Sequence, residues 1–147
     1  MDTLEIDKKV SAPGFLGAFS FDELPTKPKN GTFTVILNVD SSNLPGSHWI
    51  AIIYKNSCFY FIDSYGRHFN DGTFPKAFST TIKNYFGKNC YKTNTKMFQQ
   101  LTSNACGDYC IYFIQEMTKK SFKNVLSVFS ANLAKNDTFV TEYVKKL

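Results

Sequence analysis

The chain is poor in arginine, and this limits what its positive charge can do. Arg67 is the only arginine, although 17 basic side chains give a net charge of +5. Lysine supplies a point charge for a phosphate backbone, but it makes no bidentate contact to a base or a phosphate. The lysines form no dense run. The charge is therefore compatible with a DNA partner bound through a non-specific basic surface, and a solvated basic surface is the simpler alternative.

Histidine and cysteine are also scarce, which argues against a metal centre. There are two histidines and four cysteines. Cys106 and Cys110 have a Cys-x3-Cys spacing, but no second close pair accompanies them and both histidines are distant in sequence. A zinc site is therefore not expected, and no other cofactor is indicated. A chain of this size builds enough core to fold without a disulfide scaffold, so none is expected. An intracellular, reducing setting is the default expectation.

Long apolar runs are absent as well. No segment stays apolar for the roughly 18 residues that a membrane span needs, so no membrane partner is expected. The start of the chain, residues 2–7, is acidic where a signal peptide would be basic. The length of 147 residues and the apolar content of 43% predict one globular domain over residues 1–147, a monomer with a single core.

The hydrophobic pattern places strands in the middle of the chain and helices after them, which predicts an α+β fold. Residues 48–54 and 58–63 are apolar nearly throughout, so they are expected to be central strands joined as a hairpin across residues 55–57. The other predicted elements are strands at 32–38 and 90–97, and helices at 74–86, 106–117, 121–129 and 137–144.

Cys106 is the candidate nucleophile. It opens an apolar helical run, with Asn104 as the expected cap. A helix N-terminus and a nearby imidazolium both lower the pKa of a thiol by favouring the thiolate. The alternative is a structural core cysteine, an interpretation that suits Cys110, one turn later, better.

His48 and Asp63 are the candidate partners of the thiol. His48 stands at the mouth of one apolar strand, and Asp63 ends the next one. An acid beside four apolar residues needs a partner, and orienting His48 would provide one. The alternatives are a surface histidine near a turn and a turn aspartate. His68 is the competing histidine, but it belongs to a polar loop in which a catalytic side chain is harder to hold in place.

Attack of a thiolate on a carbonyl builds negative charge on the oxygen, which requires preorganised donors. The backbone N–H of Cys106 is one candidate. Gln99 or Gln100, just upstream, is the other, and a polar loop is the alternative role for both glutamines.

The order His48, Asp63, Gln99 or Gln100, Cys106 resembles that of the adenovirus protease (adenain) family, which belongs to the same clan as the SUMO-specific proteases. The tail is similar to adenain-type proteases of Polinton-like transposons and related DNA viruses. The resemblance extends over residues 13–144, and the segments that carry it are 13–17, 46–51, 60–66, 99–107, 127–130 and 136–140.

The resemblance implies an α+β fold with the papain core in permuted order, in which a central mixed sheet packs on the helix of the nucleophile. Cys106 would be the nucleophile, His48 the general base and acid, and Asp63 the residue that orients His48. Adenain spacing selects Gln99, seven residues before Cys106, as the oxyanion donor. SUMO-protease spacing selects Gln100 instead, and the adenain-like segment favours Gln99.

The resemblance also implies a cysteine endopeptidase that cleaves viral or transposon-encoded capsid or core precursors at glycine-containing sites during particle maturation. Such an enzyme would act in the host nucleus or cytoplasm and in the virion. Adenain is activated by DNA and by a viral peptide that bonds to a strand cysteine, and Cys90 lies near the corresponding place. Two alternatives remain: an isopeptidase that removes ubiquitin-like modifiers, and a catalytically dead, basic DNA-binding or structural virion component.

Overall fold

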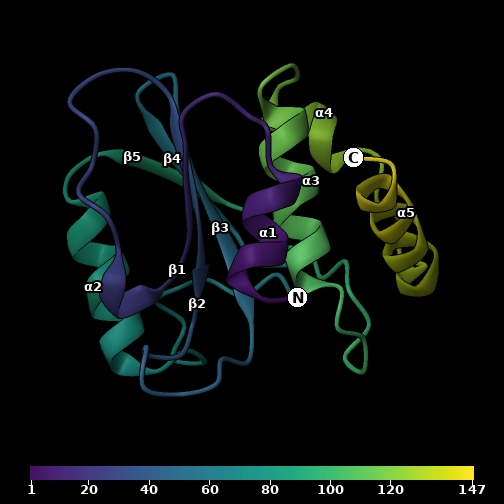
Figure 1. Ribbon diagram of the computed structural model, residues 1–147, viewed down its shortest axis with the longest axis horizontal. Helices are drawn as coiled ribbons and strands as arrows, with labels where there is room; N and C mark the ends of the chain where they lie inside the picture. Colours follow the sequence, from purple (N-terminus) through teal and green to yellow (C-terminus); the bar gives the residue numbers. More distant parts are fainter.

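A five-stranded mixed sheet forms the middle layer of the computed structural model, which describes all 147 residues. Helix α2 covers one face, and α3 covers the other with α1, α4 and α5 around it (Figure 1). The elements are α1 (Thr3–Lys9), β1 (Phe15–Ser20), a 3-10 turn (Phe21–Glu23), β2 (Phe33–Asn38), β3 (Trp49–Lys55), β4 (Cys58–Ile62), α2 (Lys76–Phe86), β5 (Cys90–Thr93), α3 (Cys106–Met117), α4 (Phe122–Leu126) and α5 (Leu133–Lys145).

The strands lie in the order β1-β2-β3-β4-β5. The three central strands are antiparallel, and the two outer strands run parallel to their neighbours. Asn56 and Ser57 join β3 to β4 with φ angles of 52° and 62°. Two successive left-handed residues match the right-handed twist of the flanking strands. The predicted hairpin is therefore confirmed.

The sheet is buried on both faces, as expected for its central strands. Alternate side chains of each strand enter different cores, because successive residues of a strand point to opposite faces. The expectation of a single core is therefore wrong: there is one core on each face of the sheet. Val35, Ile52 and Phe61 pack on the α2 side. Ile36, Ile53 and Ile62 pack on the α3 side, where α3 buries nine of its 12 residues.

The predicted bounds of α3 agree with the structure, whereas several other elements differ. Strand β5 ends at Thr93 rather than at residue 97, because the buried side chain of Asn94 turns inward to bind backbone. Helix α5 begins at Leu133, earlier than expected, since Asn132 caps it by accepting from the Lys135 N–H. Helix α1 was not predicted. No helix is both long and apolar enough to cross a membrane.

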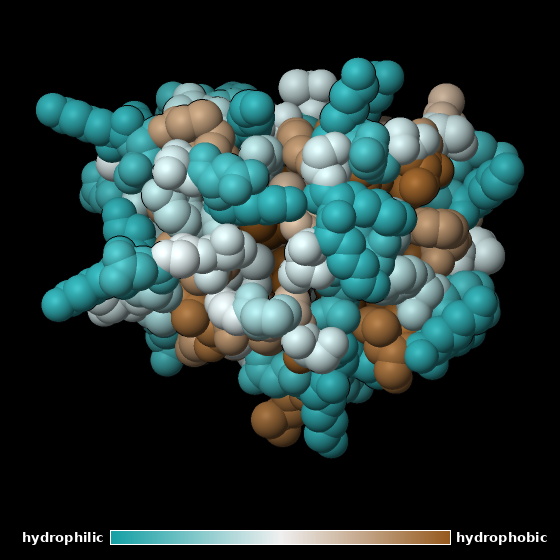
Figure 2. All heavy atoms as spheres, turned by 90° about the horizontal axis from the view of Figure 1, so that it is seen from above, coloured by the Kyte–Doolittle hydropathy of each residue, from teal (hydrophilic) through white to brown (hydrophobic).

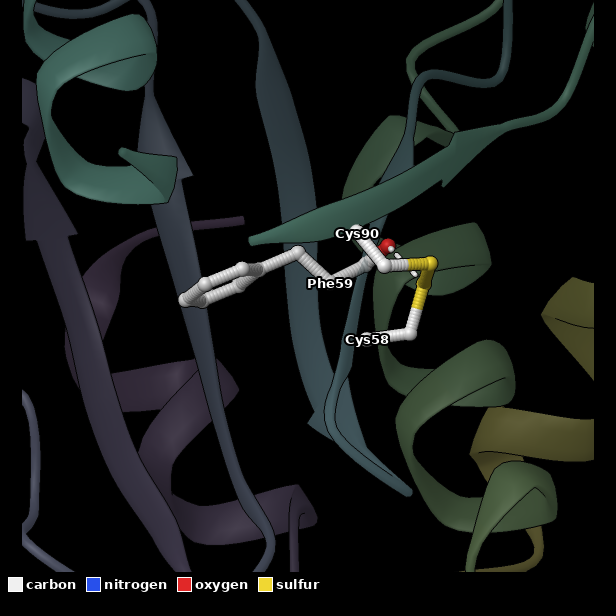
Figure 3. Close-up of a disulfide and its surroundings, with 3 residues drawn as sticks. All are labelled: Cys58, Phe59 and Cys90. Carbon is white, nitrogen blue, oxygen red and sulfur yellow. Dashed lines mark hydrogen bonds between the residues drawn. A yellow bond between two sulfur atoms is a disulfide. The ribbon is translucent and has the colours of Figure 1, made fainter. Parts of the chain in front are cut away.

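A disulfide joins Cys58 and Cys90, so the expectation of a chain without one is wrong, and cysteine usage no longer supports a reducing setting. The two cysteines are 32 residues apart, but they are paired in register across β4 and β5 with their Cα atoms 4.7 Å apart. The bridge faces α3, and Phe59 points to the opposite face of the sheet (Figure 3). The parallel pairing of β5 brings the thiols together, and no local pattern in the sequence indicates that pairing.

We predict that the disulfide contributes to stability by restricting the unfolded chain. Replacing the exposed Cys90 by serine should lower the free energy of unfolding by about 2–4 kcal/mol, measured by urea denaturation. Alkylation of the unreduced, denatured protein should modify only two cysteines, Cys106 and Cys110. Modification of all four under those conditions would show that the bridge does not form.

Candidate active site

The start of β3, the end of β4 and the start of α3 meet at one end of the central strands. His48 immediately precedes β3, Asp63 immediately follows β4, and Cys106 is the first residue of α3. Because β3 and β4 are antiparallel neighbours, the start of one lies beside the end of the other. The first turn of α3 places Cys106 beside these two strand ends. His48 and Cys106 both line a cleft of about 730 Å³.

His48 is held on two sides. Its Nε2 donates to Asp63 Oδ1 at 2.6 Å, and both side chains are buried. The Cys106 thiol lies close enough to His48 for the two groups to shift each other's pKa. Tyr65 stacks on the imidazole with ring centroids 4.9 Å apart. The ring is thereby fixed between an acid and a thiol.

Asp63 is a fully buried carboxylate with four donors. Besides His48, it accepts from the backbone N–H of Tyr65 and from both the backbone N–H and Nε of Arg67, the last at 2.8 Å. Burial alone would raise the pKa of Asp63, but the hydrogen bonds from His48 and Arg67 outweigh it and lower that pKa. The guanidinium of Arg67 also lies 4.3 Å from the ring centroid of Phe74.

Arg67 and Asn94 are site residues that the sequence motifs did not single out. The only signal for Arg67 was its position four residues after Asp63 as the single arginine. Asn94 accepts from the Asp63 N–H at 2.9 Å and donates to the Asp63 carbonyl at 2.6 Å. Gly66, the residue before Arg67, has a φ of +73°, and a Cβ there would lie 2.7 Å from the Lys96 carbonyl carbon. The loop after β4 therefore requires glycine.

The environment of Cys106 favours the thiolate. Burial acts to raise the pKa of the thiol, but the hydrogen bond from His48 and the backbone N–H groups of Trp49 and Gly107 outweigh it, so the pKa is lowered. Burial likewise opposes the charged imidazole, but the hydrogen bonds to Asp63 and Cys106 raise the pKa of His48. Both shifts favour a thiolate–imidazolium pair.

Asn104 is not the cap of α3, contrary to the expectation. The N-cap is Ala105, which makes no side-chain cap bond, and Asn104 is exposed. The Oγ of Ser103 accepts from the Ala105 N–H instead. The first turn of α3 therefore lacks a side-chain cap.

The two glutamines differ sharply. Gln99 is fully buried, and its Nε2 donates to the carbonyl and the Oγ of Ser103 at 3.0 and 3.1 Å. Gln100 is exposed. In this arrangement the Gln99 amide is bonded within the protein, so an oxyanion would have to replace Ser103 as its acceptor.

Gln99 does not line the cleft, and the two remaining candidates, Cys110 and His68, also lie outside it. Cys110 is buried, and burial raises the pKa of its thiol well above the ordinary range. His68 stacks on Phe69 and accepts from the Asn70 N–H at 3.0 Å within its loop. Neither residue lines the cleft.

No family model and no curated protein sequence matches the chain. Solved structures do resemble it. The ASFV pS273R protease has a TM-score of 0.55 and 15% identity, with 95% of this chain and 65% of that one covered. ChlaDub1 from Chlamydia trachomatis has a TM-score of 0.51 and 13% identity, with 78% of this chain and 58% of that one covered. The chain thus spans less than two thirds of either protein.

A third structure, the central domain of the uncharacterized Lpg1148 protein from Legionella pneumophila, has a TM-score of 0.54 at 9% identity, with 99% of this chain and 97% of that domain covered. Similarity at these identities establishes the fold. The expected architecture is confirmed: the chain has the α+β fold of SUMO-protease-like cysteine proteases, with a central mixed sheet packed on the helix that begins at Cys106.

Proposed function

We propose that the chain is a cysteine peptidase with Cys106 as the nucleophile. The observation that carries the proposal is the His48 imidazole, which is hydrogen-bonded to the buried Asp63 and lines one cleft together with Cys106 at the start of α3. The pKa shifts of His48 and Cys106 both favour the charged pair that nucleophilic attack needs. The likeness to the ASFV protease supports the same reaction class.

The geometry supports the following sequence of steps. The Cys106 thiolate attacks the carbonyl carbon of the scissile bond, and the carbonyl π electrons move to the oxygen. The backbone N–H of Cys106 is one donor to that oxyanion, and the Gln99 amide becomes the second once it releases Ser103. The His48 imidazolium then gives its proton to the departing amine as the C–N bond breaks, leaving a thioester. His48 next removes a proton from water as the water oxygen attacks the thioester carbon. The C–S bond then breaks, the carboxylic acid product leaves, and His48 returns the proton to the Cys106 sulfur.

For the substrate, we propose precursor polypeptides of a virus or transposon, cleaved at glycine-containing sites during particle maturation. The family resemblance and the fold of the ASFV protease support this choice. The corresponding settings are the host nucleus or cytoplasm and the virion. The proposal also includes a monomeric state and a DNA partner bound through a non-specific basic surface. Attachment of an activating peptide to Cys90 is not supported, because the sulfur of Cys90 is bonded to Cys58.

One feature favours a second candidate function, an isopeptidase for ubiquitin-like modifiers. The acid beside His48 is Asp63, as in SUMO proteases, where adenain has a glutamate. A capsid-precursor peptide and a fluorogenic ubiquitin-like C-terminal probe distinguish the two. Preferential cleavage of the precursor peptide supports the endopeptidase, and preferential cleavage of the probe supports the isopeptidase. Cleavage of neither, together with no reaction with a peptide electrophile, would contradict both and support a non-catalytic component.

We predict that Cys106 reacts with iodoacetamide faster than any other cysteine at neutral pH. Its lowered pKa keeps the thiolate populated there, so the rate should stay high at neutral pH and fall only as the pH drops through the lowered value. His48→Ala should move this profile to higher pH. Mass spectrometry of the modified folded protein identifies the site, and faster modification of Cys110 would refute the assignment.

We predict that His48→Ala reduces turnover nearly as much as Cys106→Ala, because the two residues act as a unit. Asp63→Asn should reduce turnover less, since Asp63 orients the imidazole and does not react. His68→Ala is the matched control and should retain wild-type kcat/KM. A larger loss from His68→Ala than from His48→Ala would show that the wrong histidine was chosen.

A further prediction concerns Gln99 and Gln100. Gln99→Ala should lower kcat by about 100- to 1000-fold with little change in KM, because an oxyanion donor acts on charge that develops in the transition state. Gln100→Ala, the adjacent control, should remain within a few-fold of wild type. Thermal unfolding of both variants separates this effect from a packing defect. A large loss confined to Gln100→Ala would instead favour the SUMO-protease pattern.

A further inference from the structure

A second cavity lies away from the catalytic cleft. It has a volume of about 1080 Å³. One wall is formed by β5 and the segment after it, residues 92–98, and the other by α4 and the chain that leads to α5, residues 121–133. None of its lining residues also lines the catalytic cleft. We call this cavity, defined by those two segments and Tyr60, the α4 groove.

The α4 groove is lined with apolar side chains that the fold does not cover. Tyr60 and Phe122 meet across it with ring centroids 5.0 Å apart, and the ring of Phe129, farther along, packs on the interior. Met97 is 40% exposed, and Leu126 is half-buried. Figure 2 shows hydrophobic atoms recessed between hydrophilic side chains on the upper face of the molecule. Apolar surface of this kind, bordered by polar residues, is typical of a binding groove.

The charges around the α4 groove have one sign. Lys92, Lys96 and Lys123 are exposed and line it, and no acidic residue does. None of the three ammonium groups takes part in a salt bridge, whereas Lys120 and Lys145 pair with glutamates elsewhere. An apolar groove with three uncompensated positive charges is complementary to a ligand that is both apolar and acidic.

The β5 wall of the α4 groove is preformed. Tyr60 and Lys92 are register partners in β4 and β5, two residues from the disulfide between Cys58 and Cys90. Beyond the strand, the Asn94 side chain donates to the Lys96 carbonyl at 3.2 Å. A groove whose wall is already fixed loses little conformational entropy when a ligand binds.

We propose that the α4 groove binds an acidic amphipathic segment of a partner polypeptide. Large apolar side chains of the segment fill the groove, and its carboxylates lie beside the three lysines. A nucleic acid fits less well, because the lining is largely apolar and offers only lysine, with no arginine for phosphate or base contacts. The site is separate from the proposed peptidase cleft, and its occupancy does not require catalysis.

Fluorescence anisotropy with synthetic peptides tests the proposal. The protein is the full chain carrying Cys106→Ala, so that binding is measured independently of peptidase activity. Two labelled peptides of about 12 residues combine leucine and phenylalanine with aspartate and glutamate, one alternating as a strand and one spaced as an amphipathic helix. At least one should bind, more weakly as salt is raised. Peptides with lysine in place of the acids should not bind.

Charge reversal then locates the site. Lys92→Glu with Lys123→Glu should weaken binding by at least about tenfold, since it places like charges against the ligand. Lys76→Glu with Lys83→Glu, on α2 at the opposite face of the sheet, changes the net charge equally and should bind as the parent does. Equal losses from both pairs would show a general charge effect and overturn the assignment.

A second pair of variants tests the apolar lining of the α4 groove. Met97→Ser should weaken binding, whereas Leu101→Ser, which removes an exposed apolar side chain outside the groove, should not. Circular dichroism confirms that each variant is folded. The proposal is overturned by three results: neither acidic peptide binds, the lysine peptides bind equally well, or single-stranded oligothymidylate binds in their place.

Discussion

The buried carboxylate of Asp63 is the constraint on which the site depends. A charge without exposure is costly unless it is fully paired, and here donors from His48, Tyr65 and Arg67 occupy both oxygens. The main chain of Asp63 is fixed as well, by the Asn94 side chain. Satisfying this one group therefore sets the imidazole, the loop after β4 and the end of β5 in a single arrangement.

The same loop connects the two cavities. The Ser64 carbonyl accepts from the backbone N–H groups of Phe98 and Gln99. Phe98 lines the α4 groove, and the next residue is the candidate oxyanion donor. The segment that forms one wall of the groove is thus the segment that carries Gln99 to Ser103 beside Cys106. The groove and the cleft are distinct as surfaces, although they share one stretch of main chain.

The local hydrophobic pattern of the sequence was sufficient to predict elements that are set by neighbouring residues. The apolar run from Cys106 gave α3 its bounds, and the central hairpin followed from two apolar strands around a short turn. The pattern was insufficient where distant segments meet. Helix α1 depends on a capping box between Asp2 and Glu5 in a polar segment, and Asn94 leaves its expected strand to bind Asp63. The adjacency of His48, Asp63 and Cys106 was inferable from their order, but their hydrogen bonds required the packed sheet.

The two cysteines of the Cys58–Cys90 disulfide differ in their exposure to solvent. Cys90 is exposed on an edge strand, and Cys58 is buried opposite it. Loss of Cys58 alone would leave a reactive thiol at the surface, open to exchange with thiols of other molecules. Loss of Cys90 alone would leave a buried thiol at Cys58 and an edge strand, β5, without a covalent link to β4. The two cysteines of the bridge therefore differ in what the loss of the other one would leave: a thiol open to solvent at Cys90 and a buried thiol at Cys58.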